Sequence, residues 1–127
     1  MIIESDYDNI LCKWWNDWKW TPPAKESLPL TGIIVSKDGV DICAGFVYFT
    51  NSKMVWVEYI ISNINYREKD RKEIIEYTIN GLCAIAFNQG FKYIYTSLTN
   101  ESLMKRYSNC GFIKGSSGCQ EMIKING

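Results

Sequence analysis

The first twenty residues carry apolar side chains at helical spacing. Their pattern predicts a helix over 7–20, capped by Asp6 or Ser5 and ended by the prolines at 22 and 23. Four tryptophans fall within seven residues of this segment: Trp14, Trp15, Trp18 and Trp20. We expect Trp14 and Trp18 to pack on the core and the other two to fold back under the following loop. The alternative is that the indoles form the wall of a substrate cleft or a partner surface, because an indole joins a large apolar area to one polar group.

From residue 31 the helical period gives way to β-rich runs. Apolar and β-branched residues fill three successive runs, at 31–35, 40–50 and 53–62. Asp38-Gly39 separates the first two runs and is a strong hairpin signal, and Asn51-Ser52 forms a short turn before the third. Three strands in succession with short turns predict an antiparallel meander.

A long amphipathic helix is predicted after the meander. It follows the charged stretch 67–73, and Gly90 is placed to end it. Its apolar stripe consists of Ile75, Ile79, Leu82 and Ala86. A strand at 91–98, a second helix after Asn100 and two short strands at 112–113 and 122–125 complete the predicted order.

This order predicts an α/β fold with a mixed sheet, in which the helices cover the sheet. At 127 residues we expect a single domain. Residues 1–30 form its Trp-rich N-terminal helix and loop, and residues 31–127 form the sheet and its helices.

The composition is that of a globular protein: 46% of residues are hydrophobic and 22% are charged. Fourteen basic residues balance fourteen acidic ones, so the basic footprint of a nucleic-acid binder is missing and we expect no such partner. No apolar run is long enough to span a bilayer, and the first residues do not resemble a secretion signal, so we expect a cytoplasmic protein that binds no membrane. The bias toward Ile, Asn, Lys and Tyr is typical of an AT-rich bacterial or phage genome. The sequence leaves open whether the chain forms a homodimer.

The residue types that are present limit the chemistry. There is no histidine, which excludes any Ser-His or Cys-His nucleophilic system within the chain. The five cysteines are scattered and never form a C-x-x-C pair, so we expect no metal site.

One segment carries a recognisable spacing of residues. Tyr107 lies four residues before Gly111-Phe112, and Asn100 lies seven residues before the tyrosine. This segment resembles the corresponding segment of the GNAT superfamily of acyl-CoA-dependent N-acetyltransferases, and the predicted element order from residue 31 to residue 125 is similar to the order of that fold. The resemblance implies acetyl-CoA as donor, with Tyr107 as the acid that protonates the departing thiolate and Asn100 as a hydrogen-bonding partner of the pantetheine arm. It also implies that the strands before and after the long helix splay apart to leave a cleft. Tyr107 could instead be a core residue, and Asn100 is also a good helix N-cap.

Glu58 is the candidate general base. It lies in an otherwise apolar strand, where desolvation should raise the pKa of its carboxyl toward the range of a useful base. Its position also resembles the glutamate that many GNAT enzymes place on this strand. The alternative is a strand-edge glutamate that faces solvent or pairs with a lysine. By the same resemblance, backbone amides at Ile60, Ile61 and Ser62 would polarise the acyl carbonyl.

The phosphate-binding stretch departs from the family pattern. The resemblance places the pyrophosphate loop at residues 67–72, where Asp70 and Lys72 occupy the two positions usually held by small residues. Asp70 and Glu73 have the spacing of a capping box, which would occupy the amides that a phosphate needs. The cations of this stretch could bind phosphates through their side chains instead: Arg67, Lys69, Arg71 and Lys72.

The sequence therefore predicts an acyl-CoA-dependent N-acyltransferase, specifically an N-acetyltransferase, whose acceptor is an unidentified amine of a small molecule or a protein. The alternative is an inactive protein of the same fold that has lost coenzyme A binding and serves as an interaction module.

Overall fold

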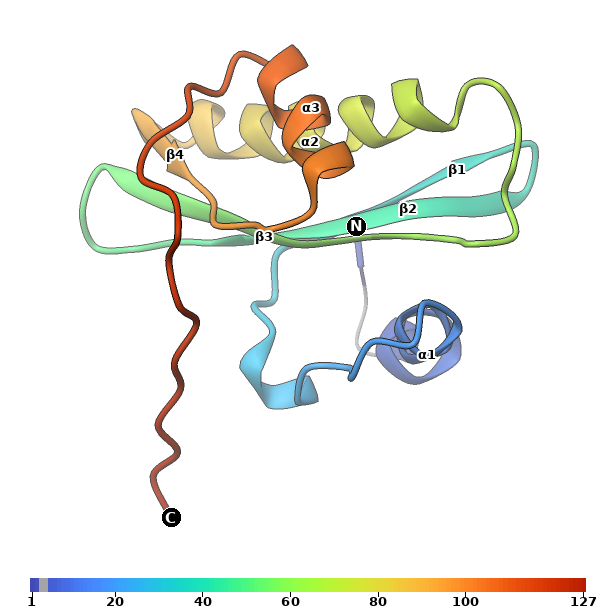
Figure 1. Ribbon diagram of the computed structural model, residues 1–127, viewed down its shortest axis with the longest axis horizontal. Helices are drawn as coiled ribbons and strands as arrows, with labels where there is room; N and C mark the ends of the chain where they lie inside the picture. The colour runs from blue at the N-terminus through green and yellow to red at the C-terminus, as the bar shows by residue number, and fades with distance from the viewer. Residues whose placement is uncertain (3–4) are drawn as a thin grey trace.

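A computed structural model describes residues 1–2 and 5–127 of the chain, and Figure 1 shows its layers. The β-sheet has four strands in the order β1-β2-β3-β4. One face of the sheet is covered by α2 and α3, and the N-terminal segment packs on the other face. The elements are η1 (Tyr7–Leu11), α1 (Cys12–Asp17), η2 (Lys25–Ser27), β1 (Gly32–Lys37), β2 (Val40–Tyr48), β3 (Met54–Ser62), α2 (Arg71–Asn88), β4 (Tyr93–Tyr95) and α3 (Glu101–Asn109).

The predicted meander is confirmed. β1 pairs antiparallel with β2, and β2 pairs antiparallel with β3. In the first turn Asp38 and Gly39 both have positive φ, at 52° and 79°, which is the conformation that a two-residue hairpin turn requires. β4 then pairs in parallel with β3 after the α2 crossover, so the sheet is mixed as expected.

The long helix is also confirmed. Ile79, Leu82 and Ala86 are fully buried against the sheet, and Gly90 follows the helix with a φ of 91°. A glycine in this left-handed conformation ends a helix without the steric cost that a Cβ would bring.

The N-terminal helix forms, but it buries a different pair of tryptophans from the one expected. Trp14 and Trp15 are each only 4% exposed, whereas Trp18 is half-buried and stacks on the exposed Trp20. The physical reason is that α1 ends at Asp17, so Trp18 lies at the C-cap, where its indole N–H donates to the Ser62 carbonyl. Trp15 lies beside Trp14 in the buried cluster on this face of the sheet.

A bulge in β3 shapes the end of the sheet. Phe46 pairs with Glu58 and Ala44 pairs with Ile61, so two residues of β3 face the single Gly45 of β2. One of those two, Tyr59, has a φ of 56°, which is uncommon for a residue other than glycine. The bulge bends β3 away from the line it would otherwise follow.

The expected splay between β3 and β4 follows from this bend. The parallel ladder joins Met54 to Tyr93 and ends where Trp56 meets Tyr95, while β3 continues to Ser62. β4 is accordingly shorter than the strand predicted at 91–98, because the rest of that segment has no neighbouring strand within reach among the described residues.

The two short C-terminal strands predicted at 112–113 and 122–125 do not form. Phe112 instead packs edge-on against Tyr107, and its N–H donates to the Tyr107 carbonyl at 3.2 Å, which closes α3. The following residues include two glycines, Gly115 and Gly118, and two serines. The conformational entropy lost on ordering them would exceed the free energy that two short strands gain from pairing. The tail is an extended segment without helix or strand (Figure 1), and its apolar residues Ile113, Met122, Ile123 and Ile125 are exposed.

Candidate active site

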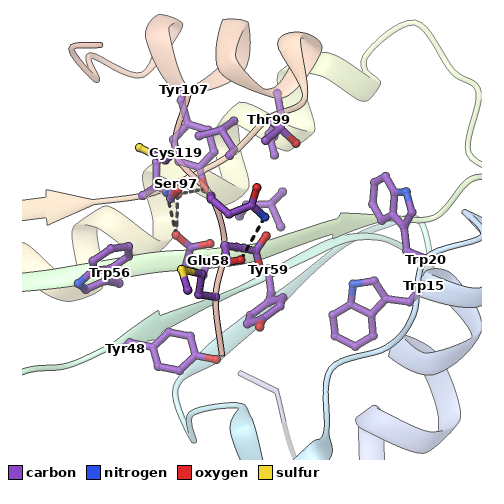
Figure 2. Close-up of a pocket in the computed structure, with 17 residues that line it drawn as sticks. Trp15, Trp20, Tyr48, Trp56, Glu58, Tyr59, Ser97, Thr99, Tyr107 and Cys119 are labelled. Atoms are coloured by element: carbon purple, nitrogen blue, oxygen red, sulfur yellow. Dashed lines mark hydrogen bonds between the residues drawn. The ribbon is translucent and has the colours of Figure 1, made fainter. Parts of the chain in front are cut away.

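A cavity of about 750 Å³ lies where β3 and β4 separate (Figure 2). Its wall is formed by β3, by the segment 96–99 that follows β4, by the inner face of α3 and by aromatic residues from the N-terminal segment and β2. Residues 119–122 of the C-terminal tail close one side. A cavity at the carboxyl end of a parallel strand is the usual position for a ligand site in α/β sheets.

Glu58 extends into this cavity from β3. Its Oε1 accepts hydrogen bonds from the backbone N–H of Ser97 at 2.9 Å and from the Thr96 hydroxyl at 3.3 Å. Burial raises the pKa of the Glu58 carboxyl above its ordinary value, and these two hydrogen bonds offset part of that rise. Glu58 forms no ion pair with a lysine or arginine of the described chain, so the alternative of a lysine-paired glutamate is wrong.

Tyr107 reaches the same cavity from α3. The side chain is 3% exposed, and its hydroxyl lies 3.5 Å from the Thr96 Oγ1. Burial raises the pKa of Tyr107 above that of an ordinary tyrosine, so the hydroxyl stays protonated at all physiological pH values. A phenol of raised pKa is a poorer acid than an ordinary tyrosine, but it keeps its proton and can donate a hydrogen bond to a nearby anion.

Thr96 connects Glu58 to Tyr107, and sequence reasoning missed it together with Ser97. The single hydroxyl hydrogen of Thr96 can serve only one of its two neighbours at a time. The available signal was the position of two polar residues near the carboxyl end of the strand predicted at 91–98, the edge at which α/β folds place their ligands.

Asn100 is the N-cap of α3. Its Oδ1 accepts the backbone N–H of Leu103 at 2.9 Å, and Asn100 does not line the cavity. The capping role considered from the sequence is thus confirmed, and the proposed contact with a pantetheine arm stays a prediction.

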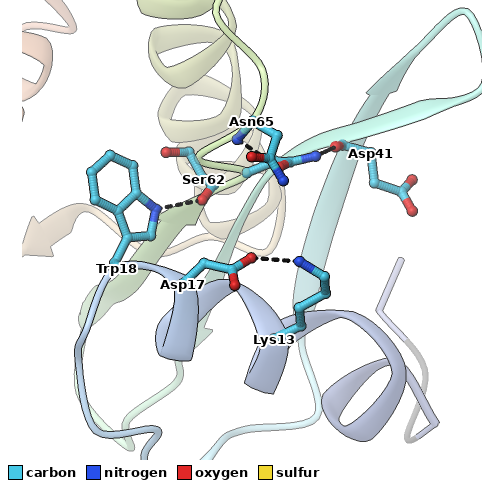
Figure 3. A network of polar contacts seen from close by, with 7 residues as sticks. Lys13, Asp17, Trp18, Asp41, Ser62 and Asn65 are labelled. Carbon is cyan, nitrogen blue, oxygen red and sulfur yellow. Dashed lines mark hydrogen bonds and ion pairs between the residues drawn. The ribbon is translucent and has the colours of Figure 1, made fainter.

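The end of β3 holds the residues expected to offer backbone amides. Ile60 lines the cavity, whereas the side chain of Ile61 belongs to the core on the opposite face of the sheet. Ser62 is buried, and its carbonyl accepts the indole N–H of Trp18 at 2.7 Å (Figure 3). Within the described residues, β4 pairs with β3 no further than Trp56, so this part of β3 has an edge without a neighbouring strand.

Among the four cations of residues 67–72, which we call the basic stretch, Arg71 is the one whose side chain has fixed contacts. It begins α2, donates from Nη2 to the Ser62 hydroxyl at 2.7 Å and stacks over the Trp18 ring at 5.3 Å. Its Nε is buried without a hydrogen-bond partner, and it forms no ion pair with a carboxylate of the described chain. Burial and the nearby Arg67 lower the pKa of Arg71. The other cations of the stretch, at positions 67, 69 and 72, are exposed.

The expected capping box between Asp70 and Glu73 does not form. The Asp70 carboxylate instead accepts hydrogen bonds from Lys37 and from the Tyr66 hydroxyl, each at 2.6 Å. The hydrogen bond from Lys37 is the main reason that the pKa of Asp70 is lowered. The hairpin between β1 and β2 places the ammonium group of Lys37 beside Asp70, and this opposite charge competes with the backbone amides for the carboxylate. Asp70 therefore leaves the amides of the first turn of α2 uncapped by its side chain, and its charge is paired.

The described residues hold neither a metal-ligand group nor a membrane-spanning helix. No group of three or more Cys, Asp or Glu side chains in residues 1–2 and 5–127 is arranged to hold a metal ion. None of the helices in the same ranges is long and apolar enough to cross a membrane.

The structure resembles several solved structures over almost its whole length, and two of the three described below are acetyltransferases. The aminoglycoside N-acetyltransferase AAC(6')-Iy, solved in complex with CoA, is 14% identical with a TM-score of 0.66, and the match covers 98% of this chain and 97% of that one. An acetyltransferase from Trypanosoma brucei is 14% identical with a TM-score of 0.67, covering 98% and 96%. The protein TTHA1254 from Thermus thermophilus is 13% identical with a TM-score of 0.68, covering 99% and 95%.

The chain has the GNAT fold. No protein-family model matches the sequence, and no curated protein is a significant match to it. The likeness at 13–14% identity therefore shows the fold, and the activity has to be argued from the residues of the site. Within the GNAT fold, Glu58 and Tyr107 lie on the two sides of the opening between the separated strands.

Proposed function

We propose that the protein is an acyl-CoA-dependent N-acyltransferase that transfers an acetyl group to an amine. The observation that carries this proposal is the convergence of Glu58 and Tyr107 on one cavity at the point where β3 and β4 separate. Burial raises the pKa of the Glu58 carboxyl, which makes it a better proton acceptor, and Tyr107 keeps its proton and can donate a hydrogen bond. A transfer from a thioester to an amine needs one group of each kind.

Each side chain has a distinct role in this proposal. Acetyl-CoA supplies the activated acyl group when it is bound. The Glu58 carboxylate accepts a proton from the acceptor nitrogen, directly or through one water, at the oxygen that Ser97 orients. The Tyr107 hydroxyl donates to the sulfur as negative charge develops there, and the backbone amides at the unpaired edge of β3 donate to the acyl oxygen.

The residues at the start of α2 fit the coenzyme's phosphates. Arg71 is a partly buried cation with an unpartnered Nε, and an anion at this helix N-terminus would satisfy it. AAC(6')-Iy, a protein of the same fold, was solved with CoA and with a CoA–acetylneamine bisubstrate analogue, which supports CoA as the donor.

The second candidate is an inactive GNAT-fold protein that serves as an interaction module. Its support is the presence of Asp70 and Lys72 at positions where close approach of the backbone to phosphate favours small residues.

Calorimetry with acetyl-CoA and with CoA separates the two candidates. We expect binding below millimolar concentration, and no heat of binding at millimolar coenzyme would refute the transferase. In the double variant Asp70→Gly, Lys72→Gly, a large gain in affinity would support the inactive protein, whereas unchanged tight binding would contradict it.

A further inference from the structure

The cavity wall beside Glu58 is largely aromatic. Six rings line it: Trp15, Trp20, Tyr48, Trp56, Tyr59 and Tyr107. Figure 2 shows the indoles of Trp15 and Trp20 together on one side, with Tyr59 between them and Glu58. These rings come from the N-terminal segment, from β2 and β3 and from α3, so residues that are distant in the sequence meet at this wall.

The aromatic wall is held in a fixed arrangement. The Tyr59 ring meets Trp15 edge-on at 6.3 Å and lies 6.3 Å from the Tyr48 ring. The positive φ of Tyr59 in the β3 bulge directs this side chain, which is 39% exposed. A backbone strained in this way is retained where the surrounding structure determines it, and such positions are concentrated at ligand sites.

The charged side chains that line the cavity are all acidic among the described residues. Glu58 and Glu121 are among its lining residues, and no lysine or arginine lines it among the described residues. The same two carboxylates contribute to the raised pKa of Tyr59, after burial as the larger cause. A ligand with its own carboxylate would therefore meet two like charges and no cation.

We propose that this aromatic and acidic wall is the acceptor subsite, and that it selects a primary ammonium carried on a flat apolar body without a carboxylate. This inference rests on the proposed transferase function, since it places the nitrogen of the acceptor beside Glu58. The ammonium lies near the two carboxylates, and the apolar body packs on Tyr59 and Trp20, which the buried Trp15 supports. A flat ring gains apolar burial and stacking against aromatic side chains, while its ammonium is attracted by the carboxylates.

The test is calorimetric titration of the protein with three probes that share one ring, in the absence of coenzyme. The probes are 2-phenylethylamine, phenylalanine and 3-phenylpropionate, which are a cation, a zwitterion and an anion. We expect 2-phenylethylamine to bind at least about tenfold more tightly than the other two. Equal affinity for the amine and the amino acid, or no binding of the amine, would overturn the inference.

Two variants test the wall itself. Trp20→Leu and Tyr59→Leu each remove one ring at a partly exposed position, and each should weaken binding of 2-phenylethylamine by about threefold to thirtyfold. Tyr77→Leu removes a 67% exposed ring on α2 outside the cavity and serves as the matched control, with unchanged affinity expected. Thermal unfolding of each variant checks that it is folded. If both ring variants bind like the control, the aromatic wall is not the subsite.

The two proposals can fail separately. If CoA binds and 2-phenylethylamine does not, the acceptor inference is wrong and the transferase proposal stands. If 2-phenylethylamine binds with the expected selectivity and CoA does not, the cation site stands and the transferase proposal is wrong.

Discussion

Replacing Arg71 with methionine should separate coenzyme affinity from stability. Arg71 begins α2, bonds to the Ser62 hydroxyl and stacks on Trp18, but no carboxylate of the described chain neutralises it. A partly desolvated cation in this position costs free energy that a bound anion would recover. Methionine keeps much of the side-chain volume and removes the charge.

The expected loss of affinity follows from Coulomb's law. A unit charge about 4 Å from a phosphate charge contributes about 4 kcal/mol at an effective dielectric of 20. Solvent reaches Arg71, so we halve this to about 2 kcal/mol, which is roughly a thirtyfold loss of CoA affinity. For the unliganded protein, the lost hydrogen bond and cation–π contact are each worth about 1 kcal/mol. Relief of the desolvated charge and of the unpartnered Nε offsets them, so the net change in unfolding free energy should stay within about 1 kcal/mol.

Calorimetry with CoA and thermal unfolding followed by circular dichroism measure the two quantities. Lys72→Met is the matched control, because Lys72 lies one residue further along, is exposed and has no fixed partner among the described residues. It should lower CoA affinity by no more than about threefold. The reasoning is refuted if Arg71→Met and Lys72→Met bind CoA equally well, or if Arg71→Met loses several kcal/mol of stability.

Three further predictions concern the cavity and the sheet. Tyr107→Phe keeps the buried ring, so its unfolding temperature should fall by less than about 5 °C. The rate of acetyl transfer should fall at least about a hundredfold. A normal transfer rate would exclude Tyr107 from the chemistry. Glu58→Gln should be more stable than the wild type at pH 7, because burial raises the pKa of the carboxyl and its ionised form opposes folding. The difference in stability should disappear as the pH falls and the carboxyl is protonated. Thermal unfolding between pH 4 and 8 measures this difference. Gly45→Ala places a Cβ 2.5 Å from Ile60 Cδ1 and 2.7 Å from Leu82 Cδ1. We expect the free energy of unfolding, measured with denaturant, to fall by about 1–3 kcal/mol. An unchanged free energy would mean that both side chains can move aside freely.

Local patterns in the sequence were sufficient for most of the fold. The Asp38-Gly39 turn, the apolar stripe of the long helix and the cap at Asn100 each depend on neighbours within a few residues, and all three are confirmed. The shift in tryptophan burial was not readable, because it depends on the end of α1 at Asp17 and on the contact of Trp18 with Ser62, which is distant in the sequence.

The basic stretch shows how a long-range contact can override a local motif. The spacing of Asp70 and Glu73 favours a capping box, yet Lys37 lies thirty-three positions away and takes the Asp70 carboxylate. Thr96 depends on long-range contacts in the same way, because it joins Glu58 to Tyr107 only where β3 and α3 approach one another. No pattern within either segment contains this information.

The sequence by itself determined the order of helices and strands as far as α3 and the candidate pair Glu58 and Tyr107, because these depend on periodicity, turn chemistry and residue spacing. Only the tertiary structure decided that the two side chains meet across one cavity and that Arg71 is the cation with a fixed position. It also decided that aromatic residues from four separate segments line the cavity with Glu58. The physical reason is the bulge at Tyr59 opposite Gly45, which ends the pairing of β3 with β4 and opens the space that these residues share. A bulge depends on the register of two paired strands, and register is a property of their contact.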